Sequence, residues 1–406
     1  MSFPPFIYVF LLLLLSCERP AKLQPLQDPD IDEDDTYILP EVDEPDVDSG
    51  TNDSGGVEPD TAEDQPEVSD LIPEDGLDAF LCPKRFERTE VGTSQHIPYC
   101  ANFDFNRPGF YPQVTRIVVA VHGVNSQGTE TYSHIEAAAS LSGADQSTLL
   151  LAPQFLTEEL IVSEGLDAEY AFWTNGWPYG SLSRSTDSNP RPFRTSSYQY
   201  LDEMLTVLQM EFILPNLSQI VVVGHSEGGQ MAQGYAAGSL LTSPPTPIKY
   251  VVANPSSYLY LSSERWVQGT EYLYGELSAD GIIACPKFNE WGYGLEALYA
   301  YMDTTGALAL ANNYLSRDVS FIVGEENTDI NDPTLSNSCE SVLQGSNRFE
   351  RGLVFYNYMQ EKFPSSLHSM AIVPEIGHDE SQVYLSECGQ VHIFDLPTLN
   401  CIDLSK

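Results

Sequence analysis

One serine of the chain stands in the surroundings of a catalytic nucleophile. The segment Gly224-His-Ser226-Glu-Gly228 has a glycine two residues before the serine and another two residues after it. It follows an apolar run at residues 220–223 and precedes a stretch of small residues. In such a turn from a buried strand into a helix, the serine is held in a strained conformation and the glycines avoid clashes. The pattern predicts that Ser226 attacks a carbonyl carbon and forms an acyl-enzyme.

A nucleophilic serine needs a general base, and His378 is the candidate. It follows an apolar run at residues 370–373, whereas His368 precedes that run and His392 lies between two cysteines. A base placed after the last long apolar run is the arrangement that the chain order serine, acid, histidine requires. We therefore predict that His378 takes the proton of the Ser226 hydroxyl.

Four residues compete for the third position of a serine–histidine–acid triad. In the expected chain order, the acid follows the apolar run at residues 319–323. The common spacing Gly-x-x-Asp places the acid three residues after Gly324, but Asn327 stands there. Asp329 is the next acid and is our prediction. The alternatives that stay open are Asp332, Glu326 and Asn327 itself.

A second motif predicts where the negative charge of the reaction is stabilised. An apolar run at residues 116–121 ends in His122 and Gly123. Attack on a carbonyl creates a negatively charged oxygen, which two backbone N–H groups stabilise when they point at it. The position of the His-Gly pair resembles the oxyanion loop of the α/β-hydrolase superfamily. The resemblance implies that one N–H belongs to Glu227, the residue after the nucleophile, and the other to Val124. The side chain of His122 is expected to be structural.

These residues need a sheet that brings the ends of several strands together. After residue 79, short runs that are apolar on both faces alternate with helical patterns, which is typical of a parallel sheet covered by helices on both sides. The runs lie at residues 116–121, 148–152, 219–223, 250–253, 319–323 and 370–373. A helix with one apolar stripe is predicted over residues 197–213, with Ser196 and Gln199 as a capping box. The sequence predicts a doubly wound α/β fold.

Taken together, these motifs resemble the α/β-hydrolase superfamily across roughly residues 80–406. The Gly-x-Ser-x-Gly segment and the His-Gly pair carry that resemblance. Further blocks resemble a group of secreted members: residues 152–155, 224–230, 253–258, 345–351 and 377–379. The resemblance implies an α/β-hydrolase fold with a mostly parallel central sheet and helices on both faces. It also implies that residues 255–318 form a cap or one wall of the pocket.

The resemblance implies a serine hydrolase, and an esterase is the favoured class. The expected partner is a small-molecule or polymer ester. An amidase or peptidase and an acyltransferase use the same residues, and a non-catalytic surface-binding protein on the same fold is the remaining alternative. No cofactor is expected, because triad chemistry needs none. No metal site is expected either, because no Cys-x-x-Cys motif or histidine-rich cluster occurs.

The N-terminus carries the features of an export signal. Residues 6–15 are almost wholly apolar but too few to span a bilayer stably. They run into Leu-Leu-Ser-Cys17, which resembles a bacterial lipoprotein signal with Cys17 as the acylated residue, although residues 1–5 contain no Lys or Arg. An ordinary signal peptide cut elsewhere and an N-terminal anchor helix are the alternatives. We expect an exported protein of the bacterial cell envelope that contacts the membrane only through a lipid at Cys17.

The cysteines are consistent with export. There are seven, and without Cys17 six remain, an even number that suggests disulfides in an exported protein. Several connectivities are open to six cysteines. Pairing between neighbours in the sequence predicts the bonds Cys82–Cys100, Cys285–Cys339 and Cys388–Cys401.

Charge divides the mature chain into two parts. The 59 acidic and 18 basic residues give a formal charge of −41, which argues against binding to nucleic acid. Residues 18–78 contain 22 Asp and Glu but only two basic residues, and they predict an acidic, disordered tether. Residues 79–406 predict one catalytic domain. Its 37 acidic and 16 basic residues argue against a strongly anionic substrate.

Overall fold

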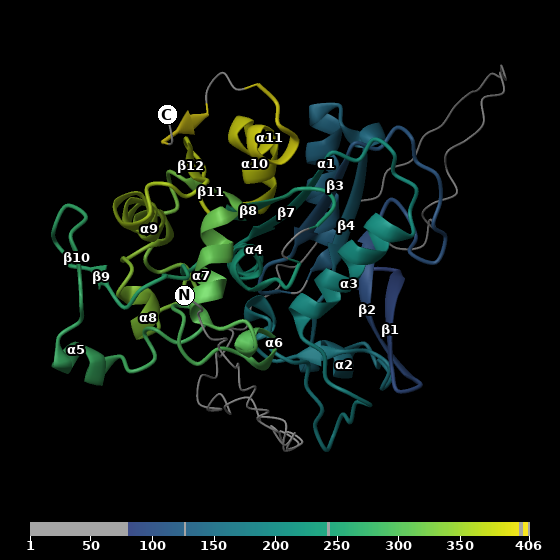
Figure 1. The fold of residues 1–406 in the computed structure, drawn as a ribbon, viewed down its shortest axis with the longest axis horizontal. Coiled ribbons are helices and arrows are strands. Elements are labelled where there is room, and N and C mark those ends of the chain that lie inside the picture. The colour runs from purple at the N-terminus through teal and green to yellow at the C-terminus, as the bar shows by residue number, and fades with distance from the viewer. Residues whose placement is uncertain (1–79, 126, 242–243, 398–400, 405–406) are drawn as a thin grey trace, which may run out of the picture. The chain divides into compact units, whose positions relative to one another are not determined.

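A sheet of nine strands, in the order β1-β2-β4-β3-β7-β8-β11-β12-β13, forms the centre of the structure (Figure 1). The computed structural model describes residues 80–125, 127–241, 244–397 and 401–404. The predicted signal peptide, Cys17 and the tether at residues 18–78 lie outside the described residues and stay predictions. In the described part of the chain, no helix has the length and apolar character needed to cross a bilayer.

The strands of the central sheet are β1 (Lys84–Glu90), β2 (Thr93–Ala101), β3 (Arg116–Val121), β4 (Thr148–Pro153), β7 (Gln219–His225), β8 (Ile248–Ala253), β11 (Asp318–Gly324), β12 (His368–Val373) and β13 (Ile402–Asp403). Two small sheets pair β5 (Leu156–Thr157) with β6 (Phe172–Trp173) and β9 (Arg265–Trp266) with β10 (Tyr274–Gly275).

The α-helices are α1 (Gly128–Ser142), α2 (Glu158–Ser163), α3 (Ser197–Met210), α4 (Glu227–Gly238), α5 (Ala279–Ala284), α6 (Ala300–Asp303), α7 (Ala307–Ser316), α8 (Cys339–Val342), α9 (Arg348–Lys362), α10 (Glu380–Leu385) and α11 (Glu387–Phe394). Short 3-10 turns lie at η1 (Asp145–Ser147) and η2 (Trp177–Tyr179).

The six inner strands, from β4 to β12 in the sheet order, run parallel to one another. Antiparallel pairs β1–β2, β2–β4 and β12–β13 extend the sheet at its two edges. In the parallel register Val121 pairs with Gly224, and Gly224 pairs with Val252. Gly324 pairs with Val373 in the same way. The carboxyl ends of β3, β7, β8, β11 and β12 therefore lie on the same side of the sheet, and the loops that follow these strands begin there.

Both faces of the sheet are buried, which explains why its strands read as continuous apolar runs. In β3, Ile117 and Val119 belong to one core, and Val118 and Ala120 belong to the core on the opposite face. The first core packs against α3, α4, α7 and α9, and the second against α1, α10 and α11 (Figure 1). The sheet, whose carboxyl end carries the candidate site, is thus packed between two layers of helices.

The six predicted apolar runs are all strands, and the fold is the predicted α/β class. The outer antiparallel strands β1, β2 and β13 were not predicted, because they mix polar and apolar residues without clear alternation. Helix α3 begins as predicted, and the Ser196 side chain accepts a hydrogen bond from the Tyr198 N–H. The predicted capping box is wrong, because the Gln199 side chain donates to Glu203 instead of reaching back to Ser196.

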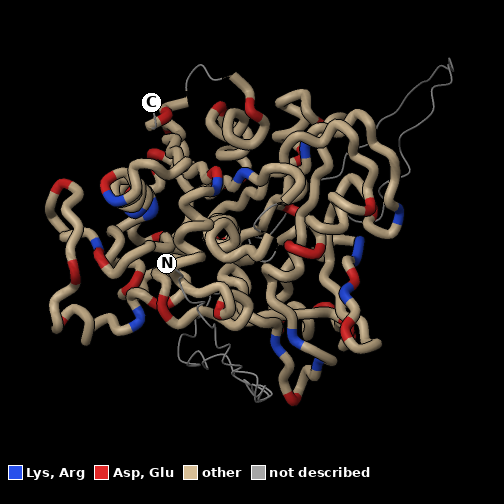
Figure 2. The backbone as a smooth tube through the Cα atoms, viewed as in Figure 1, with Lys and Arg blue, Asp and Glu red and all other residues tan. Residues whose placement is uncertain are grey.

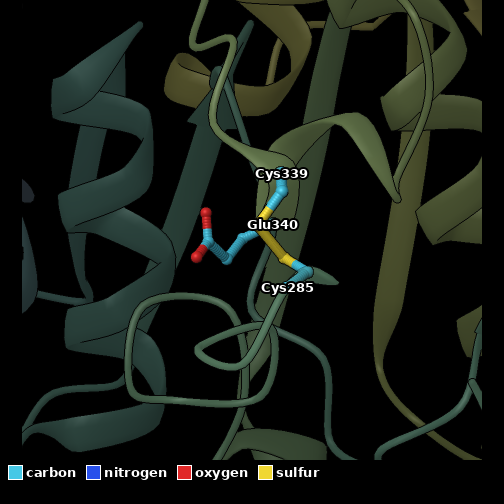
Figure 3. Close-up of side chains that lie close together, drawn as sticks. All are labelled: Cys285, Cys339 and Glu340. Carbon is cyan, nitrogen blue, oxygen red and sulfur yellow. A yellow bond between two sulfur atoms is a disulfide. The ribbon is translucent and has the colours of Figure 1, made fainter. Parts of the chain in front are cut away.

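The structure contains the three disulfides that neighbour pairing predicts, Cys82–Cys100, Cys285–Cys339 and Cys388–Cys401. Figure 3 shows the bond between Cys285 and Cys339 with the Glu340 side chain beside it. Because the two sulfur atoms of this group are bonded to each other, they are not available as thiolate ligands for a metal.

Candidate active site

Ser226 lies in a sharp turn between β7 and α4, as the glycine pattern predicts. Its backbone φ angle is 57°, in the left-handed region that a residue with a side chain rarely adopts. A Cβ atom on Gly228 would lie 2.1 Å from the Val121 carbonyl oxygen, and one on Gly224 would lie 2.1 Å from the Gly228 carbonyl oxygen. Only glycine fits at these two positions, so the strained serine depends on both.

His378 is the partner of this serine. The His378 Nε2 atom lies 3.1 Å from the Ser226 Oγ atom, which is hydrogen-bonding distance for a nucleophile and its base. The histidine is supplied by the turn between β12 and α10. Its ring packs against that of His225, with the two ring centres 4.5 Å apart. The structure thus brings together two predicted residues that are distant in the sequence.

The third predicted residue is not at the site. The other ring nitrogen of His378, Nδ1, lies 3.2 Å from Nδ2 of Asn327. Asp329 is exposed, and its carboxylate accepts a hydrogen bond from the Asn331 N–H at 2.8 Å. Among the four candidates, the structure therefore places Asn327, and not Asp329, beside the imidazole.

Backbone hydrogen bonds explain why Asn327 faces the histidine. The strand β11 ends at Gly324, and the Asn327 N–H donates to the Gly324 carbonyl oxygen at 3.1 Å. The Asn327 carbonyl oxygen accepts a hydrogen bond from the Phe349 N–H, in the first turn of α9. This tight turn points the third residue after Gly324 at the site. Asp329 lies beyond the turn, on the surface.

Asn254, which sequence analysis did not single out, joins the ends of β7 and β11 to the loop after β12. Its side-chain amide donates to Nε2 of His225 at 3.2 Å and to the Gly377 carbonyl oxygen at 3.3 Å. Its Oδ1 atom accepts a hydrogen bond from the Gly324 N–H at 2.9 Å. Asn254 thus fixes the residue before the nucleophile and the residue before the base. The sequence offers only a weak signal for this role, an asparagine directly after a strand.

The His122 side chain orients the loop that is predicted to stabilise the oxyanion. Its Nε2 accepts a hydrogen bond from the Phe155 N–H, so Nδ1 carries the proton and donates to the Gly123 carbonyl oxygen at 2.7 Å. In a trans peptide the C=O and the next N–H point in opposite directions. The Val124 N–H is therefore turned away from His122, and both Gly123 and Val124 line the cavity at Ser226. The predicted structural role of His122 agrees with these contacts.

The imidazole of His378 is a weakly basic one. Burial lowers its pKa to about 4, and the positive charge of Arg348 acts in the same direction. The carboxylates of Asp332 and Asp379 oppose this effect. The Asp332 carboxylate accepts a hydrogen bond from the Arg348 guanidinium at 2.5 Å, so it is itself partly neutralised. Burial thus favours the uncharged His378 ring at neutral pH, the state in which an imidazole can accept a proton.

Ser226 and His378 open into a cavity of about 360 Å³. The loop after β3 and the start of α1 form one side, and the turn into α10 forms another. Thr334, from the segment after β11, completes the lining. Residues 255–318, predicted as a cap or a pocket wall, contribute none of the lining residues of this cavity. A second void, of about 10 Å³, lies between α4 and Tyr179 and is too small for a substrate.

The charged groups of the cavity are mainly acidic. Glu130, Asp379 and Glu380 line it, and neither Lys nor Arg is among its lining residues. His134 forms an ion pair with Glu380 at 2.7 Å, and this hydrogen bond raises the pKa of His134 above its ordinary value. Elsewhere in the described chain, Figure 2 shows acidic residues spread over outer turns and helix ends. The candidate site is therefore an environment that favours cations.

No protein-family model matches the chain, and no curated protein matches it in sequence. Solved structures do. The poly(aspartic acid) hydrolase-1 of Sphingomonas sp. KT-1 is similar with a TM-score of 0.50 and 19% identity, over 77% of this chain and 100% of that one. LpqC of Bordetella parapertussis, a poly(3-hydroxybutyrate) depolymerase, is similar with a TM-score of 0.51 and 18% identity, over 78% and 91% of the two chains. The chain has the α/β-hydrolase fold.

Proposed function

We propose that this protein is a serine hydrolase that cleaves an ester bond, with Ser226 as nucleophile and His378 as base. The observation that carries the proposal is the 3.1 Å contact between Ser226 Oγ and His378 Nε2 at the wall of the cavity. The strained turn at Ser226 supports it, because backbone strain of this kind is maintained where function requires it.

The proposed reaction has two steps. His378 takes the hydroxyl proton while Ser226 Oγ attacks the ester carbonyl, and the backbone N–H groups of Val124 and Glu227 stabilise the oxyanion. The proton passes to the leaving alcohol, and the acyl group stays on Ser226. Water then attacks the acyl-enzyme, loses its proton to His378, and releases the carboxylic acid and the free serine. Among the described residues, neither of these two N–H groups is engaged in a hydrogen bond, so both are free to bind the oxyanion.

Asn327 takes the place of the triad acid in this proposal. General-base catalysis needs the proton on Nδ1 of His378, so that Nε2 is free to accept the serine proton. A half-turn of the Asn327 amide presents Oδ1 in place of Nδ2 and accepts that Nδ1 proton without any change of shape. The triad is then serine, histidine and asparagine, in which the amide orients the ring and adds no negative charge.

Covalent labelling tests the proposal directly. The full-length protein, treated with a fluorophosphonate probe, is expected to carry the probe on Ser226, located by mass spectrometry of its peptides. Hydrolysis is then measured on short-chain esters, on matched amides and on poly(3-hydroxybutyrate), the polymer in the name of one similar structure. Folded protein that neither reacts with the probe nor turns over any ester would favour the non-catalytic binding role instead.

The substitution Asn327→Asp is expected to change the pH profile. The new carboxylate would lie at hydrogen-bond distance from Nδ1 and raise the pKa of His378 from about 4. Because only the neutral imidazole acts as base, kcat/KM of the variant should fall off at a higher pH than in the wild type as the solution is acidified. The measurement is kcat/KM for one ester between pH 3.5 and 9.

Two internal controls accompany this profile. Burial raises the pKa of Glu227 to about 7, and any inflection from that group should occur at the same pH in both proteins. Asp329→Asn should leave the profile unchanged, because Asp329 does not contact the imidazole. A shift in Asp329→Asn and none in Asn327→Asp would restore Asp329 as the triad acid.

The acidic cavity predicts a preference for substrates with a cationic group. We expect kcat/KM for butyrylthiocholine to exceed that for its neutral isostere, S-(3,3-dimethylbutyl) thiobutyrate, by about fivefold, which corresponds to about 1 kcal/mol from partly solvated charges. Added salt should reduce the ratio. Glu130→Gln should reduce it as well, whereas Glu136→Gln, on the same helix outside the cavity, should not. Equal rates for the two esters would show that the carboxylates do not contact the substrate.

A further inference from the structure

His96, in strand β2, is a buried histidine with an unsatisfied nitrogen. The residue is 4% exposed, and its Nε2 atom has no hydrogen-bond partner in the described part of the chain. The ring packs edge-on against Tyr170, with ring centres 4.1 Å apart. A buried nitrogen without a partner costs free energy, and in native proteins such a group commonly binds a water molecule or an ion.

Two carboxylates converge on this histidine. Asp167 and Glu169 belong to the turn between α2 and β6, and each presents an oxygen atom. These oxygens and a ring nitrogen of His96 all lie within 4.8 Å of one another. In the described structure neither carboxylate forms an ion pair, and the Glu169 side chain accepts no hydrogen bond. The Asp167 carboxylate accepts a hydrogen bond from the Glu169 N–H at 3.0 Å.

The backbone holds the three side chains together before any ligand binds. The His96 N–H donates to the Glu169 carbonyl oxygen at 2.8 Å, and the Ala171 N–H donates to the His96 carbonyl oxygen at 2.9 Å. The Tyr170 N–H closes the turn on the Asp167 carbonyl oxygen. Strand β2 and the turn are therefore fixed to each other on both sides of the histidine, which lowers the entropy cost of collecting the three ligands.

We propose that His96, Asp167 and Glu169 bind a divalent transition-metal ion, with Zn²⁺ as the best fit. An imidazole nitrogen combined with carboxylate oxygens suits zinc, whereas calcium and magnesium prefer oxygen ligands alone. Three protein ligands leave a position for water. Binding would draw the ligand atoms in to about 2.0–2.2 Å from the ion. This proposal replaces the expectation of no metal, which rested on the absence of ligands close together in the sequence.

Two positive groups, Arg85 and Arg191, lie near the site and must be considered. The Arg85 guanidinium packs over the Tyr170 ring, 5.0 Å from its centre. Its charge opposes a cation, but in the described chain it forms no ion pair with Asp167 or Glu169. The Arg191 Nε atom donates to the Tyr170 carbonyl oxygen, and its guanidinium packs over the Phe172 ring. In the described chain neither arginine forms an ion pair with Asp167 or Glu169, so both carboxylates remain available to a metal ion.

The proposed ion stabilises the fold and takes no part in the reaction. None of its three ligands is among the residues that line the cavity at Ser226. The ion would add a further link between the segment from α2 to β6 and strand β2 of the central sheet. Its loss should therefore lower the melting temperature and leave kcat unchanged.

The test titrates Zn²⁺ into the full-length protein after treatment with EDTA, by calorimetry and by thermal unfolding. We expect one tight site per chain and a rise in melting temperature of about 3 °C at saturating metal. The double variant Asp167→Asn, Glu169→Gln changes only exposed side chains and should still fold, as circular dichroism can verify. Its affinity should fall by tenfold or more, and the shift in melting temperature should disappear.

The control is the double variant Glu159→Gln, Glu164→Gln. It removes the same charge from exposed positions on and beside α2, so a general electrostatic effect, including weak binding by the acidic residues 18–78, would be equal in both proteins. Equal loss of affinity in both double variants would overturn the site, as would wild-type affinity in Asp167→Asn, Glu169→Gln. Tight binding of Ca²⁺ with no binding of Zn²⁺ would exclude the imidazole as a ligand.

Discussion

Ser226→Ala is expected to abolish fluorophosphonate labelling and to lower kcat for ester hydrolysis by about 10⁴- to 10⁶-fold, as removal of an activated serine does in other hydrolases. The variant lacks the oxygen that forms the acyl bond, and in the described chain no other serine forms a hydrogen bond with the His378 ring. KM should change little, because the cavity and the predicted oxyanion N–H groups remain. The measurement is labelling intensity together with steady-state kinetics on the best ester of the panel.

Ser381→Ala is the matched control for this experiment, because Ser381 lines the same cavity but forms no hydrogen bond with His378 in the described chain. It should keep labelling and activity. Labelling that persists in Ser226→Ala would show that the probe reacts elsewhere. Activity that persists there would remove Ser226 from the mechanism.

The inner sheet and the serine–histidine pair could be predicted because both depend on local patterns. A strand buried on both faces must be apolar throughout, so β3, β7 and β11 can be recognised in the sequence as continuous apolar runs. The turn at Ser226 needs glycine at positions where a Cβ atom would meet a backbone oxygen, so its sequence is distinctive. His378 could be predicted because the base is expected after the last inner strand, and few histidines lie in that part of the sequence.

The third residue of the triad could not be predicted from residue type. The spacing after Gly324 indicates the right position, but Asn327 is not an acid. The prediction therefore chose Asp329, the next acid along the chain. The residue that lies beside His378 is determined by backbone hydrogen bonds of Asn327 with Gly324 and with Phe349. The second of these contacts joins segments that only the folded sheet brings together.

Contacts between distant segments also explain the other omissions. Asn254 acts through loops that follow three different strands, and an isolated asparagine carries no pattern that would reveal this. The cluster of His96, Asp167 and Glu169 exists only because β2 lies beside the turn before β6. Such sites depend on which strands and turns lie side by side in the fold. The periodicity of residues along the chain does not indicate this.

His378→Ala is expected to lower kcat by about 10³- to 10⁵-fold and to slow fluorophosphonate labelling strongly, because the Ser226 hydroxyl loses its proton acceptor. The remaining rate should come from the oxyanion N–H groups and from substrate positioning. Removal of the ring leaves space beside Ser226, so added imidazole should restore part of the activity. The restored rate should rise with the concentration of neutral imidazole and therefore with pH, up to a plateau above the pKa of free imidazole.

His134→Ala separates the role of a base from that of a cavity histidine. His134 lines the same cavity and pairs with Glu380, but it does not contact Ser226. Its loss should leave labelling intact, change kcat/KM by less than about tenfold, and give no response to imidazole. Loss of activity with imidazole rescue in His134→Ala but not in His378→Ala would assign the base to His134, and the 3.1 Å contact at Ser226 would be structural. Full activity in both variants would exclude the serine–histidine mechanism.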